Sequence, residues 1–339
     1  MNKKGILLVN LGTPNSPSTA DVRKYLNEFL MDARVINVHP IWRTLLVKGL
    51  ITPFRAPKSA ALYQKIWSDQ TGSPLKHYSL LQADLLQKRL GNNYQVELAM
   101  RYEQPSIELA LMKLQEAQVS SIRVIPLFPQ YASASTGSVL EKVMNLISKW
   151  QAVPSMSWLS SFHNNELMIK TFAENARKYQ PDTYDHILFS FHGLPESQLK
   201  SADHSGQHCL KTATCCNTIS TNNQLCYAAQ CHATARLIAK ELNLVADKYT
   251  ICFQSRLGSD PWVRPYTVEV IKALATAGNK RLLVLCPAFV ADCLETVYEI
   301  TVEYHELFKS LGGEHMQLVE SLNDHPKWIA ALEELVKNI

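Results

Sequence analysis

The chain has 339 residues, of which 46% are hydrophobic and 19% charged, which is enough for two ordinary domains. Its formal net charge of +4 falls short of the basic excess typical of nucleic-acid binding, so we expect no nucleic-acid partner. No apolar run approaches the roughly 20 residues of a membrane span, and the run that follows Lys3 and Lys4 is too short for a signal peptide. We therefore expect a cytoplasmic protein.

Short apolar strands alternate with amphipathic helices along the chain, with capping residues such as Ser18 and Ser106 at helix starts. This alternation predicts an α/β fold with parallel sheets flanked by helices. The expected strands are 6–11, 95–100, 122–127, 186–191, 250–254, 282–286 and 315–319. The expected helices are 18–31, 76–90, 105–118, 137–150, 165–178, 228–243, 265–277, 292–311 and 325–338.

The two halves of the chain repeat one pattern. Each opens with a strand that ends in a loop containing Gly and Pro, and each later has a strand that ends in Pro-x-Phe. We expect two Rossmann-like domains, residues 1–160 and 161–324, with an active-site cleft between them. The helix in 325–339 is expected to pack back on the first domain. Neither GxGxxG nor GxxxxGK[ST] follows a strand, so we expect no bound nucleotide.

The segment 41–51 mixes apolar side chains with Arg43 and Lys48. Such a mixture is typical of helices that lie on a membrane surface, and an ordinary core helix is the more common alternative. The first alternative predicts peripheral contact with the inner face of the membrane.

His192 ends the apolar run of the fourth expected strand, because Gly193 and Pro195 prevent its continuation. Ligands of open α/β sheets bind at the carboxyl ends of strands. A histidine there can exchange protons near neutral pH or bind a metal, although a hydrogen-bonded turn histidine is the more common case.

Cysteines gather between residues 209 and 231 with the spacing C-x5-C-C-x9-C-x4-C. Disulfides are rare in the cytosol, whereas thiolates in a polar loop suit Zn²⁺ or an iron–sulfur cluster. Paired CxxC knuckles are missing from this segment, which disfavours a simple zinc module. Free thiols are the third alternative. The five cysteines are Cys209, Cys215, Cys216, Cys226 and Cys231.

Three carboxylates, Glu295, Glu299 and Glu303, recur every fourth residue and share one helix face, with no Lys or Arg between 287 and 308. Their helix follows a strand end at the same edge of the sheet as His192. A solvated acidic face is the ordinary explanation. Alternatively, the carboxylates replace the waters of a divalent cation, or their mutual repulsion raises their proton affinity for proton transfer.

Several motifs, in this order, make the chain resemble the ferrochelatase family over roughly 1–200 and 226–339. They are Leu8–Pro14, Arg101-Tyr102 before Pro105, Pro126–Tyr131 with Thr136–Ser138, Ser190–Pro195, Phe253–Gly258 with Trp262, and Asp292–Thr296. The resemblance implies insertion of Fe²⁺ into protoporphyrin IX to give protohaem with release of two protons, the last step of haem biosynthesis.

The resemblance also implies roles for individual residues. His192 matches the active-site histidine and Glu295 its partner carboxylate, the two expected to meet the Fe²⁺ substrate. Glu299 and Glu303 match an acidic route on a helix that is widened to π form in the family. The remaining matches are Arg101 and Tyr102 near the proposed metal entry, Tyr63, Ser73 and Trp262 in the porphyrin pocket, and 41–51 as an apolar lip. Cys293 replaces a histidine found in animal relatives, and we expect it to be a packed thiol.

Some ferrochelatases, including a bacterial group with an internal cysteine-rich segment, carry a [2Fe–2S] cluster. By that resemblance we expect an insert at about 200–231 with Cys209, Cys215, Cys216 and Cys226 as ligands and Cys231 as the alternate. The alternatives for the activity are a coproporphyrin III ferrochelatase, a sirohydrochlorin-type chelatase and a non-enzymatic haem carrier. A monomer and a homodimer both stay open.

Overall fold

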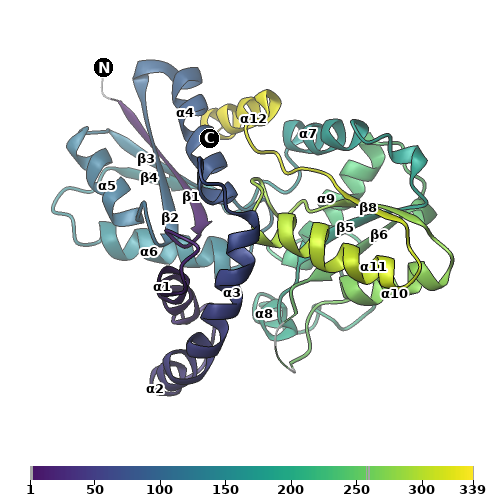
Figure 1. Cartoon of the computed structure of the whole chain (residues 1–339). Coiled ribbons are helices and arrows are strands. Elements are labelled where there is room, and N and C mark those ends of the chain that lie inside the picture. The colour runs from purple at the N-terminus through teal and green to yellow at the C-terminus, as the bar shows by residue number, and fades with distance from the viewer. Residues whose placement is uncertain (1–2, 257, 259, 339) are drawn as a thin grey trace. The chain divides into compact units, whose positions relative to one another are not determined.

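The computed structural model describes residues 3–256, 258 and 260–338, so residues 1, 2, 257, 259 and 339 of the expected domain ranges lie outside it. The described residues form two compact units, one of 3–128, 133–160 and 332–338, the other of 129–132 and 161–331. In each unit, helices cover a four-stranded parallel sheet (Figure 1). The expected domain bounds stay a prediction, because a compact unit need not fold alone.

The first unit is built on a parallel sheet with strand order β2-β1-β3-β4. Alternate residues of the strands pack against α5 and α6 in a core that includes Leu7, Leu111, Val124 and Val143. The strands are β1 (Lys4–Gly12), β2 (Tyr94–Tyr102), β3 (Ser121–Pro126) and β4 (Ser155–Trp158). The helical segments are α1 (Thr19–Leu30), α2 (Pro40–Thr44), η1 (Leu45–Ile51), α3 (Thr52–Ile66), α4 (Pro74–Leu90), η2 (Gly91–Asn93), α5 (Ile107–Glu116), η3 (Ser133–Gly137) and α6 (Ser138–Ile147).

The second unit repeats this arrangement with strand order β6-β5-β7-β8. The central strand β5 is buried along its length up to Phe191. The strands are β5 (His186–His192), β6 (Tyr249–Gln254), β7 (Arg281–Leu285) and β8 (His315–Leu318). The helical segments are α7 (Glu166–Arg177), η4 (Pro181–Thr183), α8 (Glu196–Ser201), α9 (Tyr227–Glu241), η5 (Ala246–Lys248), α10 (Thr267–Thr276), η6 (Leu294–Tyr304) and α11 (His305–Ser310).

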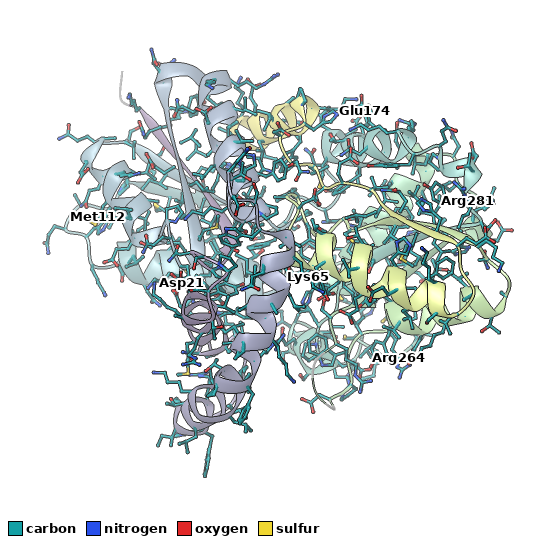
Figure 2. The ribbon with its side chains drawn as sticks, viewed as in Figure 1. Asp21, Lys65, Met112, Glu174, Arg264 and Arg281 are labelled. Atoms are coloured by element: carbon teal, nitrogen blue, oxygen red, sulfur yellow. The ribbon has the colours of Figure 1, made fainter. Side chains whose placement is uncertain are left out.

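The C-terminal helix α12 (Pro326–Lys337) contributes residues to both units. In the second, Lys327 pairs with Glu174 of α7 at 2.5 Å; Figure 2 labels Glu174. In the first, Arg123 of β3 donates to the carbonyl oxygens of Leu335 and Asn338 at 3.0 and 2.7 Å. These bonds satisfy carbonyls at the helix end that have no partner within the helix.

All seven expected strands are present within two residues of their predicted bounds, and Ser18 and Ser106 cap α1 and α5 as predicted. The short strand β4 was not predicted, because its four residues follow a proline and carry a weak pattern. The core-helix alternative for 41–51 is wrong. Ile41 and Trp42 are 64% and 67% exposed, and Val47 is the one residue of that segment that is fully buried among the described residues.

Candidate active site

His192 is the last residue of β5, and its imidazole orientation is set by its own chain neighbour. Nδ1 lies 2.7 Å from the carbonyl oxygen of Gly193. A carbonyl only accepts, so Nδ1 carries the proton in this bond and Nε2 of the neutral ring keeps its lone pair. Only glycine fits at position 193, because a Cβ there would lie 2.9 Å from the Gln254 carbonyl. The sequence therefore places an available proton acceptor at the strand end.

Gln254, the last residue of β6 and the register partner of His192, ties this strand end to the carboxylate helix. Its amide oxygen accepts from Ser190 at 2.7 Å, which directs the amide nitrogen toward η6. That nitrogen donates to the Glu295 carbonyl at 2.8 Å and to a Glu299 carboxylate oxygen at 3.0 Å. Ser255 donates to the same oxygen at 2.7 Å. Ser255 adopts φ of 65°, a conformation that costs energy in a serine and is typical of functional sites.

The predicted widening of the carboxylate helix is confirmed, because η6 is a π-helix over Leu294–Tyr304. It begins beside a buried carboxylate, Asp292, which accepts from the Thr296 hydroxyl at 3.0 Å and from Asn323 at 2.7 Å. Cys293 is buried as expected, and burial raises the pKa of its thiol.

Burial and then the neighbouring charge of Glu295 raise the pKa of Glu299 to about 7, although the bonds from Ser255 and Gln254 oppose the rise. The charge of Glu303 adds to it. The sequence predicted this direction from mutual repulsion alone, whereas burial is the larger cause. Glu303 is exposed, so the row of carboxylates runs from a partly buried end to a solvent end.

Trp262 lies beside His192, with ring centroids 6.4 Å apart. It pairs with Pro195 through a β-bridge, and a Cβ at position 193 would lie 3.1 Å from its ring. Thus the structure brings together four predicted residues of the second unit, His192, Glu295, Glu299 and Trp262.

In the first unit, Arg101 and Tyr102 end β2 and share one carboxylate, Asp32. Arg101 donates to Asp32 at 2.6 Å and Tyr102 at 2.9 Å. The Ser138 hydroxyl donates to the same oxygen at 2.5 Å and accepts from Arg101 at 2.6 Å. Burial opposes ionisation of Asp32, yet the bonds from Ser138 and the Arg34 amide, with the charge of Arg101, lower its pKa. Asp32 was not predicted, because its side-chain partners lie 69 to 106 residues away.

The other two predicted residues of the first unit are buried near the start of α4 and in α3. Ser73 precedes α4 and its hydroxyl accepts from Thr13, which follows β1, at 2.9 Å. Tyr63 packs edge-on against Trp67 with ring centroids 6.4 Å apart. Thr13 belongs to a motif that the sequence singled out, but its contact with Ser73 had no sequence signal.

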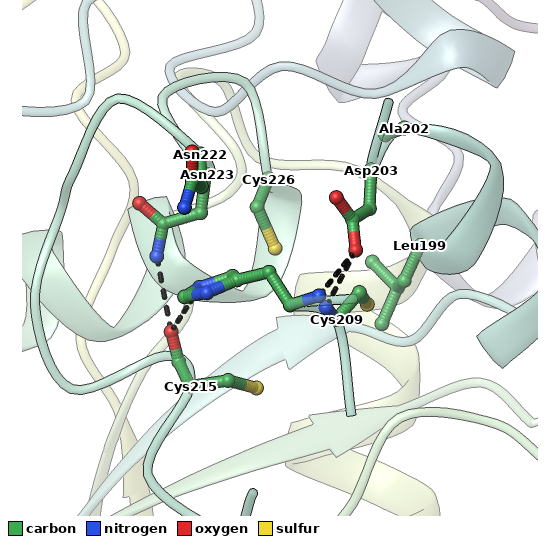
Figure 3. Close-up of a pocket in the computed structure, with 9 residues that line it drawn as sticks. Leu199, Ala202, Asp203, Cys209, Cys215, Asn222, Asn223 and Cys226 are labelled. Atoms are coloured by element: carbon green, nitrogen blue, oxygen red, sulfur yellow. Dashed lines mark hydrogen bonds between the residues drawn. The ribbon is translucent and has the colours of Figure 1, made fainter. Parts of the chain in front are cut away.

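Three of the predicted cluster cysteines, Cys209, Cys215 and Cys226, line one small cavity (Figure 3). The fourth, Cys216, has its sulfur 3.6 Å from that of Cys215. A hydrogen bond from Cys216, followed by amide groups at the start of α9, lowers the pKa of the Cys226 thiol, although burial opposes this. Among the described residues, no three His, Cys, Asp or Glu side chains are placed as a ready metal site.

Cys231 lies inside α9 and is not among the residues that line this cavity. It is fully buried, and burial raises the pKa of its thiol. Tyr227, one turn earlier, is its hydrogen-bond partner. Asp203 organises the loop around the cavity instead, accepting from the amides of His208 and Cys209 at 2.9 and 2.8 Å.

The two parallel sheets and their helices define an α/β protein of the chelatase type. The solved structure titled "SirB from Bacillus subtilis with Fe3+" shares this fold with a TM-score of 0.50 and 13% identity, covering 99% of this chain and 94% of that one. Residues 3–339 match the family model described as Ferrochelatase. The chain is 44% identical to the ferrochelatase of Legionella pneumophila (strain Philadelphia 1) over 98% of both chains. It is also 44% identical to that of Coxiella burnetii (strain Dugway 5J108-111), covering 99% of this chain and 94% of the relative. The chain belongs to the ferrochelatase family.

Proposed function

We propose that this protein inserts Fe²⁺ into protoporphyrin IX and that His192 accepts the pyrrole protons. As a ferrochelatase, it is a lyase that inserts iron into a porphyrin in haem biosynthesis. The observation that carries the role of His192 is its bond to the Gly193 carbonyl at 2.7 Å, which leaves Nε2 free to accept. Metallation must remove two N–H protons from the porphyrin, and a neutral imidazole is suited to that step near pH 7.

Glu299 supports a path for these protons away from His192. A carboxyl group with a pKa of about 7 takes up and releases protons readily at neutral pH. Gln254 holds both Glu299 and the main chain of Glu295, so the helix is fixed beside the histidine strand. We propose that Glu295 receives protons from His192 and that Glu299 and Glu303 conduct them outward.

The same carboxylates suit the iron substrate. Fe²⁺ must lose its water shell before insertion, and successive carboxylates can replace those waters. Arrival of the cation would displace the proton of Glu299. The same three carboxylates would therefore carry iron inward and protons outward in alternation. We propose Glu295 and His192 as the residues that meet Fe²⁺ at the inner end.

Five residues predicted from the sequence are the candidates for substrate binding. We propose that Arg101 and Tyr102, held by Asp32, stand near the metal entry, and that Tyr63, Ser73 and Trp262 line the porphyrin pocket. Tyr63, Ser73 and Tyr102 are buried, and Ser73 accepts a hydrogen bond from Thr13. Such fixed side chains support the proposal, because a pocket that distorts a planar ring must itself be rigid. Insertion rates measured on protoporphyrin IX, coproporphyrin III and sirohydrochlorin test the choice of substrate. A faster rate on either of the last two would contradict it.

We propose that Cys209, Cys215, Cys216 and Cys226 hold a [2Fe–2S] cluster, for which four thiolates are the usual ligands. Three of them share a cavity and the fourth bonds to Cys226, so the donor set fits. The group would supply a one-electron redox centre and a covalent tie for the loop. Cys231 is packed in α9 instead.

Iron content and visible absorption of anaerobically purified protein test this assignment. We expect about two irons per chain, lost in Cys226→Ala and kept in Cys231→Ala. Bound zinc or a colourless, metal-free protein would contradict it.

We propose that the segment from α2 to α3 contacts a membrane surface. The α2 end of this segment is the part of its unit farthest from the sheet, and α3 runs from there back toward the sheet (Figure 1). Exposed apolar side chains there include Trp42, Leu50 and Phe54, and residues 33–68 contain no Asp or Glu. Among the described residues, no helix is long and apolar enough to cross a membrane. Cosedimentation with anionic vesicles, reduced in Trp42→Ser with Phe54→Ser, tests the contact, and equal binding by both proteins would contradict it.

A further inference from the structure

Tyr227, the first residue of α9, holds the end of β5 from outside the sheet. Its hydroxyl donates to the main-chain carbonyl of His192 at 2.7 Å, and its side chain is 7% exposed. Pairing of β5 with β7 ends earlier, at Phe189. Because buried carbonyl groups need a partner, Tyr227 supplies the bond that the sheet no longer provides at this position.

The peptide unit that Tyr227 holds directly precedes the carbonyl that orients the His192 imidazole. The carbonyl of this unit belongs to His192 and accepts from Tyr227. Its N–H belongs to Gly193 and donates to the Gln254 carbonyl at 2.8 Å. Both ends of one peptide plane are therefore fixed. The next carbonyl along the chain, that of Gly193, accepts from Nδ1 of His192. Rotation of this plane would carry the Gly193 carbonyl away from the ring.

Tyr227 also follows directly on Cys226, which precedes the first turn of α9. Cys226 faces the cavity in the cysteine loop, whereas Tyr227 faces the sheet. One turn later, the Cys231 thiol is the second hydrogen-bond partner of the Tyr227 hydroxyl. A displacement of Cys226 would thus move the side chain that holds His192.

We propose that Tyr227 is a positioning residue that fixes the His192–Gly193 peptide and couples the cysteine loop to the catalytic histidine. The inference rests on the proposed role of His192 as proton acceptor. It gives the Tyr227 hydroxyl, in the first turn of α9, a role that the proposed cluster ligands do not account for. All the contacts that support it are between residues of this chain.

Tyr227→Phe removes the hydroxyl and leaves the ring. We expect kcat for metal insertion to fall about tenfold, as for the loss of one buried hydrogen bond, with KM for the porphyrin unchanged. Nitrogen-15 NMR of labelled histidine should show the ring of His192 change from the Nδ1–H tautomer to a mixture. The His192→Ala spectrum identifies its signal among the 11 histidines.

Tyr179→Phe is the matched control, because it removes a hydroxyl that donates to Glu320 at 2.8 Å in the same unit. It should leave kcat and the tautomer unchanged. A folded Tyr227→Phe variant with wild-type kcat and tautomer would overturn the positioning role. Retained turnover in His192→Ala would instead overturn the proposed function, while the tautomer measurement would still test the geometry.

The coupling is tested by Cys226→Ser, which does not depend on the folding of Tyr227→Phe. Hydrogen exchange of the Gly193 amide should become at least tenfold faster in this variant, because the peptide is held less firmly. The control is Thr276→Ala, which removes a hydroxyl that donates to the Lys272 carbonyl on α10 at 2.9 Å, in the same unit. Unchanged exchange in Cys226→Ser, or the same rise in the control, would overturn the coupling.

Discussion

Each sheet has a polar network at its strand ends, but the pKa of the central carboxyl group is shifted in opposite directions in the two networks. At the end of β2, the carboxylate of Asp32 meets a cation, Arg101, and its pKa is lowered. Beside β5 and β6, the carboxylate of Glu299 accepts from the neutral donors Gln254 and Ser255 and lies near other carboxylates, and its pKa rises to about 7. A neutralised ion pair holds its geometry, whereas a carboxyl group near its pKa exchanges protons.

This difference in pKa indicates that the two networks have different roles. The Asp32 network accepts bonds from three side chains and is suited to keeping Arg101 and Tyr102 in place. The Glu299 network adjoins a histidine with a free Nε2 and is suited to moving protons and cations. If the comparison is right, substitutions in the first should change stability and binding, and substitutions in the second should change turnover and pH dependence.

The largest effect should come from His192→Ala. Loss of a positioned general base lowers rates by about 10²- to 10⁴-fold, and porphyrin affinity should stay within a factor of about three. Insertion rates and a porphyrin fluorescence titration measure the two quantities. His305→Ala, at the start of α11, is the control and should retain turnover. Near-normal turnover in His192→Ala would remove the histidine from the mechanism.

Asp32→Asn should mainly destabilise the fold. The pair with Arg101 is largely buried, with side chains 15% and 7% exposed, so leaving the cation unpaired should cost about 3 kcal/mol in the free energy of unfolding. Urea denaturation measures this. Asp84→Asn, which breaks an exposed pair with Lys88, should cost less than about 0.5 kcal/mol. Equal effects of the two substitutions would erase the contrast between the networks.

Glu299 should make the fold less stable as the pH rises. Its pKa in the folded protein is about 7, above the ordinary value of 4.5, so the folded state binds more protons than the unfolded state between those limits. Stability is therefore full below pH 4.5 and should fall by about 3 kcal/mol up to pH 7. Glu299→Gln should remove this decline in urea unfolding measured at pH 5 and pH 8. A decline that persists in the variant would locate the titrating group elsewhere.

The polar residues at the strand ends could be predicted from the sequence, but the contacts that they make could not. His192 was identifiable because an apolar run followed by Gly193 marks where a buried strand stops. Glu299 was identifiable because its spacing repeats along one helix. Asp32 and Tyr227 were not, since each acts through a bond to a residue 35 to 106 positions away, and local patterns carry no information on such pairs. Burial, the main cause of the Glu299 pKa, also comes from distant elements.

The smallest expected effect distinguishes whether the row of carboxylates carries iron or protons. Glu303→Gln leaves the buried end intact and removes only the exposed charge, so the apparent KM for Fe²⁺ should rise about threefold through weaker local attraction. Adding Glu299→Gln should raise it further while porphyrin affinity changes less. The exposed Glu306→Gln, on α11, is the matched control. Because a path for protons alone would change kcat and leave the iron dependence as it was, an unchanged KM in the double variant would restrict the row to proton transfer.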